Sequence, residues 1–198
     1  MNAFEQASQV EARGVVRLAP WLEERALGGN VVWTAKGRLS RFLQETIGDA
    51  VFQERETGAL VAVELKCENR FTGNLFLETW SNRNLEHASD HAMRGSTPGW
   101  LCKSKADALL YYFLDSDTLV TCSVLALKRW AFDAPRSSFD DRGYPLVGRI
   151  YDYRITRQSR YAQMNDTWGH IVPIEHLRSE IGARKFRVQQ LELPELAA

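Results

Sequence analysis

The chain has 198 residues, of which 44% are hydrophobic, so it is long enough to bury a core as one domain over 1–198. Its 25 basic and 25 acidic side chains cancel, so the overall charge indicates neither a nucleic-acid nor a membrane partner, and any such surface must be local. Three cysteines without a short paired spacing argue against a disulfide framework and a zinc knuckle. The start of the chain lacks a signal-peptide pattern, and no apolar run approaches the about 20 residues that span a bilayer, so a cytoplasmic protein without a membrane partner is expected.

Periodicity and turn residues predict the elements in chain order. Helices are expected over 4–12, 20–29 and 36–46, and strands over 30–33, 50–55, 58–67, 74–80 and 118–125. A long loop is expected over 81–99, and further helices over 104–114, 126–132 and within 172–186. The segment 148–161 is expected to run from a strand into a loop. The order predicts an α/β fold with a mixed central sheet flanked by helices.

One stretch, GDAVFQERETGALVAVELKCENR over 48–70, combines an apolar run with adjacent charges. The run ALVAV continues directly into Glu64 and Lys66, which lie two residues apart and therefore share one face of a strand. A hairpin turn at Glu56 and Thr57 sets Asp49 opposite Glu64, with Cβ atoms about 5 Å apart. The hairpin is therefore predicted to gather Asp49, Glu64 and Lys66.

Two carboxylates this close repel each other unless a proton or a cation lies between them. Mg²⁺ prefers hard oxygen ligands and takes one or two carboxylates, with water and substrate phosphate in its other positions. A neighbouring lysine can orient or help deprotonate the attacking water, so the set predicts phosphodiester hydrolysis. Two alternatives stay open: an ordinary salt-bridged strand end, and a one-residue slip at Gly58 that turns Asp49 away and leaves Glu54 or another acid in its place.

The order of elements around these residues resembles that of a known group. A helix, the Asp49 strand, the strand with Glu64-Leu65-Lys66, a third strand, a helix and a strand resemble the αβββαβ core of the PD-(D/E)XK nuclease superfamily, the restriction-endonuclease-like fold. The resemblance covers about 36–125, with 1–35 as an N-terminal helical extension and 135–198 as a C-terminal extension. The segments GNLFLETWSN, PGWLCKSKADALLYYF and NDTWGHIVPI are also similar to uncharacterised phage and bacterial members.

The resemblance implies a site for Mg²⁺ or Mn²⁺ formed by Asp49, Glu64 and the carbonyl of Leu65, with Lys66 as the catalytic lysine. The chain departs from the pattern in one respect, because Gly48 stands where a proline often precedes the aspartate.

Other acids and histidines are weaker candidates. Glu45 lies near the end of the expected helix 36–46, where the resemblance implies a helix-borne acid, and a solvated carboxylate is the alternative. Glu78 interrupts the strand 74–80 and reaches the edge of the site if that strand lies next to the Glu64 strand. Glu68 is expected to face solvent. The remaining candidates are interpreted as a solvated loop or as structural histidines: His87, Asp90, His91, His170 and His176.

Basic residues suggest where a polymer lies. Lys103 and Lys105 open the expected helix 104–114, where they contact a phosphate or are simply exposed. The segment 142–160 contains five arginines and one acid, Asp152, with tyrosines between them. This composition is typical of a nucleic-acid surface and also of an ordinary sheet edge. The candidate contacts in this segment are Arg149, Arg154, Arg157 and Arg160.

The leading hypothesis is a Mg²⁺-dependent endo- or exodeoxyribonuclease, with nucleic acid, expected to be DNA, as its partner. A homodimer is among the expected assemblies, because many nucleases of this superfamily must cut two strands. The alternatives are a catalytically inactive nucleic-acid or protein-binding module on the same fold, and a metal-dependent hydrolase of another phosphate ester.

Overall fold

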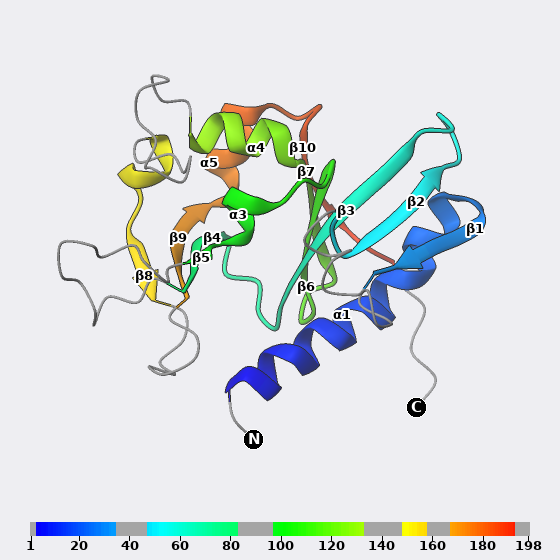
Figure 1. The fold of residues 1–198 in the computed structure, drawn as a ribbon, viewed down its shortest axis with the longest axis horizontal. Helices are drawn as coiled ribbons and strands as arrows, with labels where there is room; N and C mark the ends of the chain where they lie inside the picture. The colour runs from blue at the N-terminus through cyan, green and yellow to red at the C-terminus, as the bar shows by residue number, and fades with distance from the viewer. Residues whose placement is uncertain (1–2, 35–46, 83–96, 133–147, 158–166, 193–198) are drawn as a thin grey trace. The chain divides into compact units, whose positions relative to one another are not determined.

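The computed structural model describes residues 3–34, 47–82, 97–132, 148–157 and 167–192. The chain forms two compact units, and each is described by itself (Figure 1). Unit 1 consists of Met1–Thr72, Ser104–Val124 and Ala183–Ala198, and unit 2 of Gly73–Lys103 and Leu125–Gly182. The expected core over 36–125 thus contributes to both units. In the described ranges no helix is long and apolar enough to cross a membrane.

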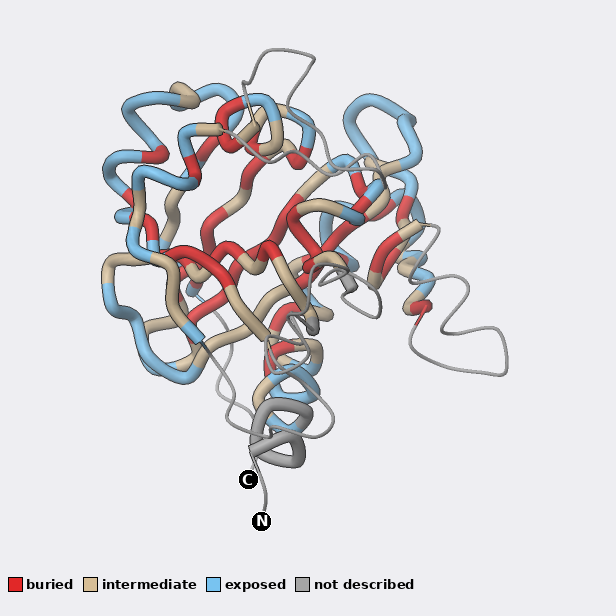
Figure 2. Tube along the Cα trace, turned by 60° about the vertical axis from the view of Figure 1, so that its left-hand side comes forward, coloured by how far each residue is buried: buried red, intermediate tan, exposed pale blue. Residues whose placement is uncertain are grey.

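Unit 1 is built on a six-stranded sheet in the order β1-β2-β3-β6-β7-β10. Strands β3 and β6 run parallel, and every other neighbouring pair is antiparallel, which confirms the predicted mixed sheet of an α/β fold. The strands are β1 (Ala26–Trp33), β2 (Ala50–Glu54), β3 (Leu60–Glu68), β6 (Ala108–Phe113), β7 (Thr118–Ser123) and β10 (Phe186–Gln190). Figure 2 shows the buried residues of the strands in red.

A single long helix, α1 (Ala3–Arg25), replaces the two helices expected over 4–12 and 20–29. Pro20 lies inside it, and the buried side chains of Leu18 and Leu22 on either side continue one apolar stripe into the core, so packing outweighs the lost hydrogen bond. The prediction that Gly28 and Gly29 end a helix was wrong, because both lie in β1 with positive φ, where the β1–β2 register shifts.

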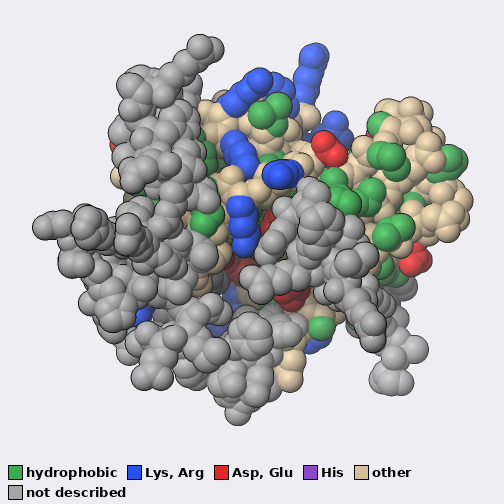
Figure 3. All heavy atoms as spheres, viewed as in Figure 1, with side chains coloured by type: hydrophobic (Ala, Val, Ile, Leu, Met, Phe, Trp, Pro, Cys, Tyr) green, Lys and Arg blue, Asp and Glu red, His purple; other side chains and the backbone are tan. Residues whose placement is uncertain are grey.

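The core of unit 1 lies between α1 and one face of the sheet. Its buried members come from α1, from the strands β1, β2, β3, β6 and β7, and from the segment after β10. They are Leu18, Leu22, Ala26, Ala50, Phe52, Val63, Leu65, Leu110, Tyr112, Leu119 and Leu191. The helix packs against β1 and β3. On the opposite face of the β1–β3 corner, Val32 and Leu60 are exposed apolar residues, and hydrophobic side chains (green) appear at this end of the molecule in Figure 3.

Close packing of α1 on β3 depends on Gly14. A Cβ atom at this position would lie 2.1 Å from the Cys67 Sγ atom, far inside van der Waals contact. Gly14→Ala is therefore expected to destabilise the protein by about 2 kcal/mol, although alanine favours a helix by about 1 kcal/mol.

Adding Cys67→Ala to Gly14→Ala removes the clashing sulfur and is expected to restore most of that loss in urea unfolding, as a double-mutant cycle. A stabilising Gly14→Ala variant would contradict the packing of α1 on β3.

The helix predicted over 104–114 was wrong, because ALLYYF forms the strand β6. Five of its six residues are buried, and β6 lies between β3 and β7, so both of its faces and both of its edges are covered. A short continuous apolar run fits a buried strand or a buried helix equally well by periodicity, and the two tyrosines and the phenylalanine favour the strand.

Unit 2 contains a four-stranded sheet in the order β5-β4-β9-β8. Its elements are β4 (Asn74–Asn82), β5 (Thr97–Pro98), α3 (Trp100–Lys103), α4 (Val124–Ala131, of which Val124 belongs to unit 1), the 3-10 helix η2 (Arg149–Asp152), β8 (Ile155–Arg157), β9 (Trp168–Pro173) and α5 (Ile174–Ile181). The predicted helix over 126–132 and the helix ending near Gly182 are confirmed. The helix expected over 36–46 lies outside the described residues.

Candidate active site

The predicted hairpin register is confirmed. Strand β2 pairs with β3 without a bulge, from Gln53 opposite Leu60 to Ala50 opposite Val63. The ladder ends at Ala50, and Asp49 precedes it in a bend, where its N–H donates to the Val63 carbonyl at 2.7 Å. The one-residue slip at Gly58 is therefore excluded for the paired residues of β2.

Gly48 positions Asp49 at the entrance to β2. Its φ is +130°, and a Cβ atom there would lie 2.5 Å from the Val63 carbonyl oxygen. Thr34, after β1, binds this turn, because its hydroxyl donates to the Gly48 carbonyl and its N–H donates to the Asp49 carbonyl. Proline cannot adopt this φ, so the backbone geometry at this position accounts for a glycine and excludes a proline.

The Asp49 carboxylate reaches the edge of β3 beyond the end of β2. Its Oδ2 atom accepts the Leu65 N–H at 2.7 Å, which satisfies a backbone donor that β2 no longer covers. The N–H and carbonyl of one residue in an antiparallel ladder point to the same neighbour, so the Leu65 carbonyl is directed to the same edge as Asp49. This direction agrees with the role that the resemblance implies for it.

Glu64 and Lys66 form an ion pair on one face of β3. The Lys66 Nζ atom lies 2.8 Å from the Glu64 Oε1 atom. The Glu64 side chain is 11% exposed and the Lys66 side chain 29% exposed, so the carboxylate is inside and the amine lies nearer solvent. The predicted salt bridge is present, and the unusual feature is that its acid is buried beside a second acid.

Burial raises the pKa of Asp49 to about 6; Lys66 counteracts this and Glu64 adds to it. The carboxylates of Glu64 and Asp49 outweigh the effect of burial on Lys66 and raise the pKa of its amine. The amine is therefore an ammonium group that donates hydrogen bonds at neutral pH, and Asp49 is the acid whose charge is most costly without a counterion.

Glu11 on α1 is a further acid near the site that the sequence analysis missed. Its charge raises the pKa of Asp49, of Lys66 and of the Cys67 thiol. Glu11 is exposed, but it continues the helical stripe of Leu18 and Leu22 at spacings of seven and eleven residues, and a carboxylate in line with an apolar stripe is the signal that could have identified it.

The expectation that Glu68 faces solvent was wrong. Glu68 lies in β3 and is partly buried, it accepts a hydrogen bond from the Tyr111 hydroxyl, and burial raises its pKa. Tyr111 lies opposite Lys66 in the parallel pairing of β3 with β6. Alternation along β3 therefore puts Glu64, Lys66 and Glu68 on one face, with Tyr111 beside the lysine.

The donor set fits a hard divalent cation in kind and in number. Within the part of the chain that the structure describes, no group of three or more His, Cys, Asp or Glu residues could hold a metal ion. Mg²⁺ needs only one or two carboxylates with waters, and a cation would offset both the burial that raises the pKa of Asp49 and the smaller repulsion from Glu64. Asp49 and Glu64 are thus the residues that would hold it.

The two supporting acids of the sequence analysis are Glu78 and Glu45. Glu78 lies in β4, whose sheet neighbours are β5 and β9, so the expectation that its strand lies next to the Glu64 strand was wrong. Glu78 accepts a hydrogen bond from Ser81 within unit 2. Glu45 lies outside the described residues.

The basic candidates are distributed over both units. Lys103 ends α3 in unit 2, Lys105 follows in unit 1, and both are exposed. Neither opens a helix over 104–114, because that segment is β6.

The arginine-rich segment is only partly described. Arg154 is exposed, Arg157 lies over the Trp168 ring, and Arg149 is ion-paired with Glu180. Of the tyrosines, Tyr151 packs edge-on against His170 and Tyr153 hydrogen-bonds to His176. Arg142, Arg160, Tyr144, Tyr161, His87, Asp90 and His91 lie outside the described residues. The expected strand at 148–161 is the helix η2 followed by β8.

Comparison of the chain with protein-family models, with curated proteins and with solved structures found no match in any of the three.

Proposed function

We propose that the protein is a divalent-metal-dependent nuclease that hydrolyses DNA phosphodiester bonds, with Asp49 and Glu64 holding Mg²⁺ or Mn²⁺ and Lys66 assisting the attacking water. The observation that carries the proposal is the pairing of β2 with β3, which brings the acid just before β2 close to the acid and the ammonium group on one face of β3.

The order of elements also supports a PD-(D/E)XK-like core. Among the described elements, a helix, three strands, a helix and a strand occur in the order α1, β1, β2, β3, α3 and β6, with β4 and β5 before α3. In this assignment Asp49 precedes the second strand and Glu64 lies on the third, one strand later than the sequence analysis assumed.

Each residue has a distinct part in the proposed reaction. Asp49 is held in place by the Leu65 N–H, and Glu64 by the Lys66 ammonium group. When bound, the metal would supply a polarised phosphate oxygen and a more acidic water. Lys66 is charged at neutral pH, so it would orient the water and stabilise negative charge on the phosphate, rather than remove the proton.

Glu64→Gln tests the assignment. Removing this charge is expected to lower the rate of Mg²⁺-dependent DNA cleavage by about 100-fold or more and to abolish the heat of Mn²⁺ binding in calorimetry. The matched control is Glu54→Gln, because Glu54 is the acid on β2 that a register slip would have brought to the site. Cleavage that survives Glu64→Gln would refute the assignment of Glu64 to the active site, and no Mg²⁺-dependent cleavage by the unchanged protein would refute the nuclease proposal.

A binding module without chemistry is the second candidate. It is favoured by the Glu64–Lys66 pair, which neutralises the buried acid without a metal. Calorimetry separates the two, because a binding module takes up no Mg²⁺ or Mn²⁺ that depends on Asp49.

A further inference from the structure

Helix α1 borders an open hollow in unit 1. The hollow measures about 370 Å³ and is lined by Ala12, Arg13, Val16 and Arg17 of α1 and by Leu114, the residue after β6. Val16 is 56% exposed, so the hollow opens to solvent. Two guanidinium groups and three aliphatic side chains are therefore presented together, and this site is named the α1 hollow.

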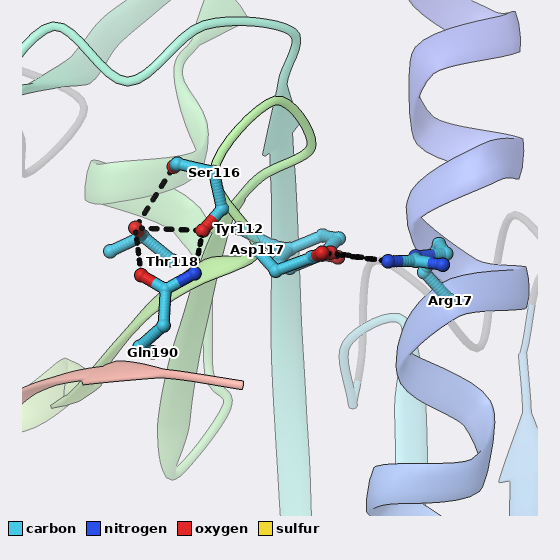
Figure 4. A network of polar contacts seen from close by, with 6 residues as sticks. All are labelled: Arg17, Tyr112, Ser116, Asp117, Thr118 and Gln190. Carbon is cyan, nitrogen blue, oxygen red and sulfur yellow. Dashed lines mark hydrogen bonds and ion pairs between the residues drawn. The ribbon is translucent and has the colours of Figure 1, made fainter. Parts of the chain in front are cut away.

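Arg17 is held in a fixed orientation at one wall of the α1 hollow. Its Nη2 atom donates to both carboxylate oxygens of Asp117, at 2.8 Å and 2.7 Å, as Figure 4 shows. Asp117 lies in the β6–β7 turn with φ +46°, and the Tyr112 hydroxyl also donates to it. The two bonds from Nη2 to Asp117 therefore fix the orientation of the guanidinium group.

Arg13 contributes a cation without a carboxylate partner among the described residues. It is exposed, and no ion pair joins it to a described acid. Asp117 offsets the charge of Arg17, so the α1 hollow keeps about one net positive charge, on Arg13. An anionic occupant is favoured, and guanidinium groups match the geometry of phosphate oxygens.

The α1 hollow lies on the same helix that reaches the candidate active site. Glu11 acts on Asp49 and Lys66, and Gly14 contacts Cys67, the neighbour of Lys66. Glu11 lies two residues before Arg13 and six before Arg17, about 3 Å and 9 Å along the helix axis, so the acid and the α1 hollow share one short stretch of α1.

We infer that the α1 hollow binds a phosphodiester of the substrate strand, outside the bond that is cut, through Arg13 and Arg17. This inference rests on the proposed nuclease function. The lining contains no aromatic ring to stack on a base and no amide side chain to read one. The aliphatic walls pack against the sugar, and the contact is independent of sequence.

The test is binding of a fluorescent single-stranded oligonucleotide to the full chain in EDTA, where no cleavage occurs, over a NaCl series. Arg13→Gln is expected to weaken binding about tenfold and to reduce the slope of log K against log salt by about 0.7, the loss of one phosphate contact. The matched control is Arg187→Gln, since Arg187 is exposed on β10 of the same unit, and its slope is expected to equal that of the unchanged protein.

Each result decides the inference. A slope unchanged by Arg13→Gln, an oligonucleotide that fails to bind the unchanged protein, or an effect limited to one base sequence would overturn it. Inorganic phosphate is added as a competitor. If Arg13→Gln abolishes competition by phosphate but leaves the salt dependence of oligonucleotide binding unchanged, the α1 hollow is a site for free anions, and the inference is overturned as well. If the protein cuts DNA but Arg13→Gln has no effect on binding, only the inference about the α1 hollow is rejected. If Arg13→Gln weakens binding but the protein does not cut DNA, the binding inference is kept and the proposed nuclease function is rejected.

Discussion

Replacing Lys66 with methionine is expected to lower the rate of DNA hydrolysis by about 100- to 1,000-fold, the range found when one charge-stabilising donor is removed from an active site. Methionine keeps the volume of the aliphatic stem and removes the ammonium group that lies 2.8 Å from Glu64. The measurement is the single-turnover rate of cleavage at saturating Mg²⁺, so that a change in metal affinity does not enter.

The matched control is Lys185→Met, because Lys185 is an exposed lysine of unit 1 that precedes β10. Circular dichroism in the presence of Mg²⁺ checks that the Lys66→Met protein is folded. A rate for Lys66→Met within twofold of the control would remove the lysine from the mechanism.

Asp49→Asn is expected to stabilise the metal-free protein at pH 7 by roughly 2–3 kcal/mol, because the folded state raises the pKa of this carboxyl from 3.8 to about 6. A carboxyl with a raised pKa binds its proton more tightly in the folded state. The free energy of unfolding therefore falls as pH rises from about 4 to about 6, and the loss is complete above that range. Asparagine keeps the oxygen that accepts the Leu65 N–H and has no charge to bury.

Urea unfolding in EDTA between pH 4 and pH 7.5 measures this difference. Glu68, whose pKa is also raised, and Asp117, whose pKa is lowered, are present in both proteins, so their contributions cancel in the comparison. Mg²⁺ is expected to stabilise the unchanged protein at pH 7 and not the variant. Parallel pH profiles for the two proteins would show that the charge of the Asp49 carboxylate does not destabilise the folded protein.

Local pattern was sufficient for the hairpin. A short turn between two β-rich runs sets the pairing of Ala50 with Val63, so the place of Asp49, one residue earlier and close to Glu64, follows from residue order. The helix α5 and its end at Gly182 follow in the same way from helical spacing and a glycine with positive φ.

Long-range packing decided what local pattern could not. The segment 108–113 is apolar on both faces, and only its position between β3 and β7 makes it a strand. Strand β4 has strong strand character, but its sequence does not say which sheet it joins, and it pairs with β9, nearly a hundred residues later. Pairing partners far apart in sequence leave no periodic signal.

The sequence by itself determined the acid, acid and lysine set, because all three residues lie within one hairpin whose geometry is local. The tertiary structure alone decided that Glu11 approaches this set, that Glu78 belongs to another sheet, and that Arg13 and Arg17 face Leu114. Each of these contacts joins elements separated by many residues, and side-chain packing between such elements depends on the whole fold rather than on the spacing of residues along the chain.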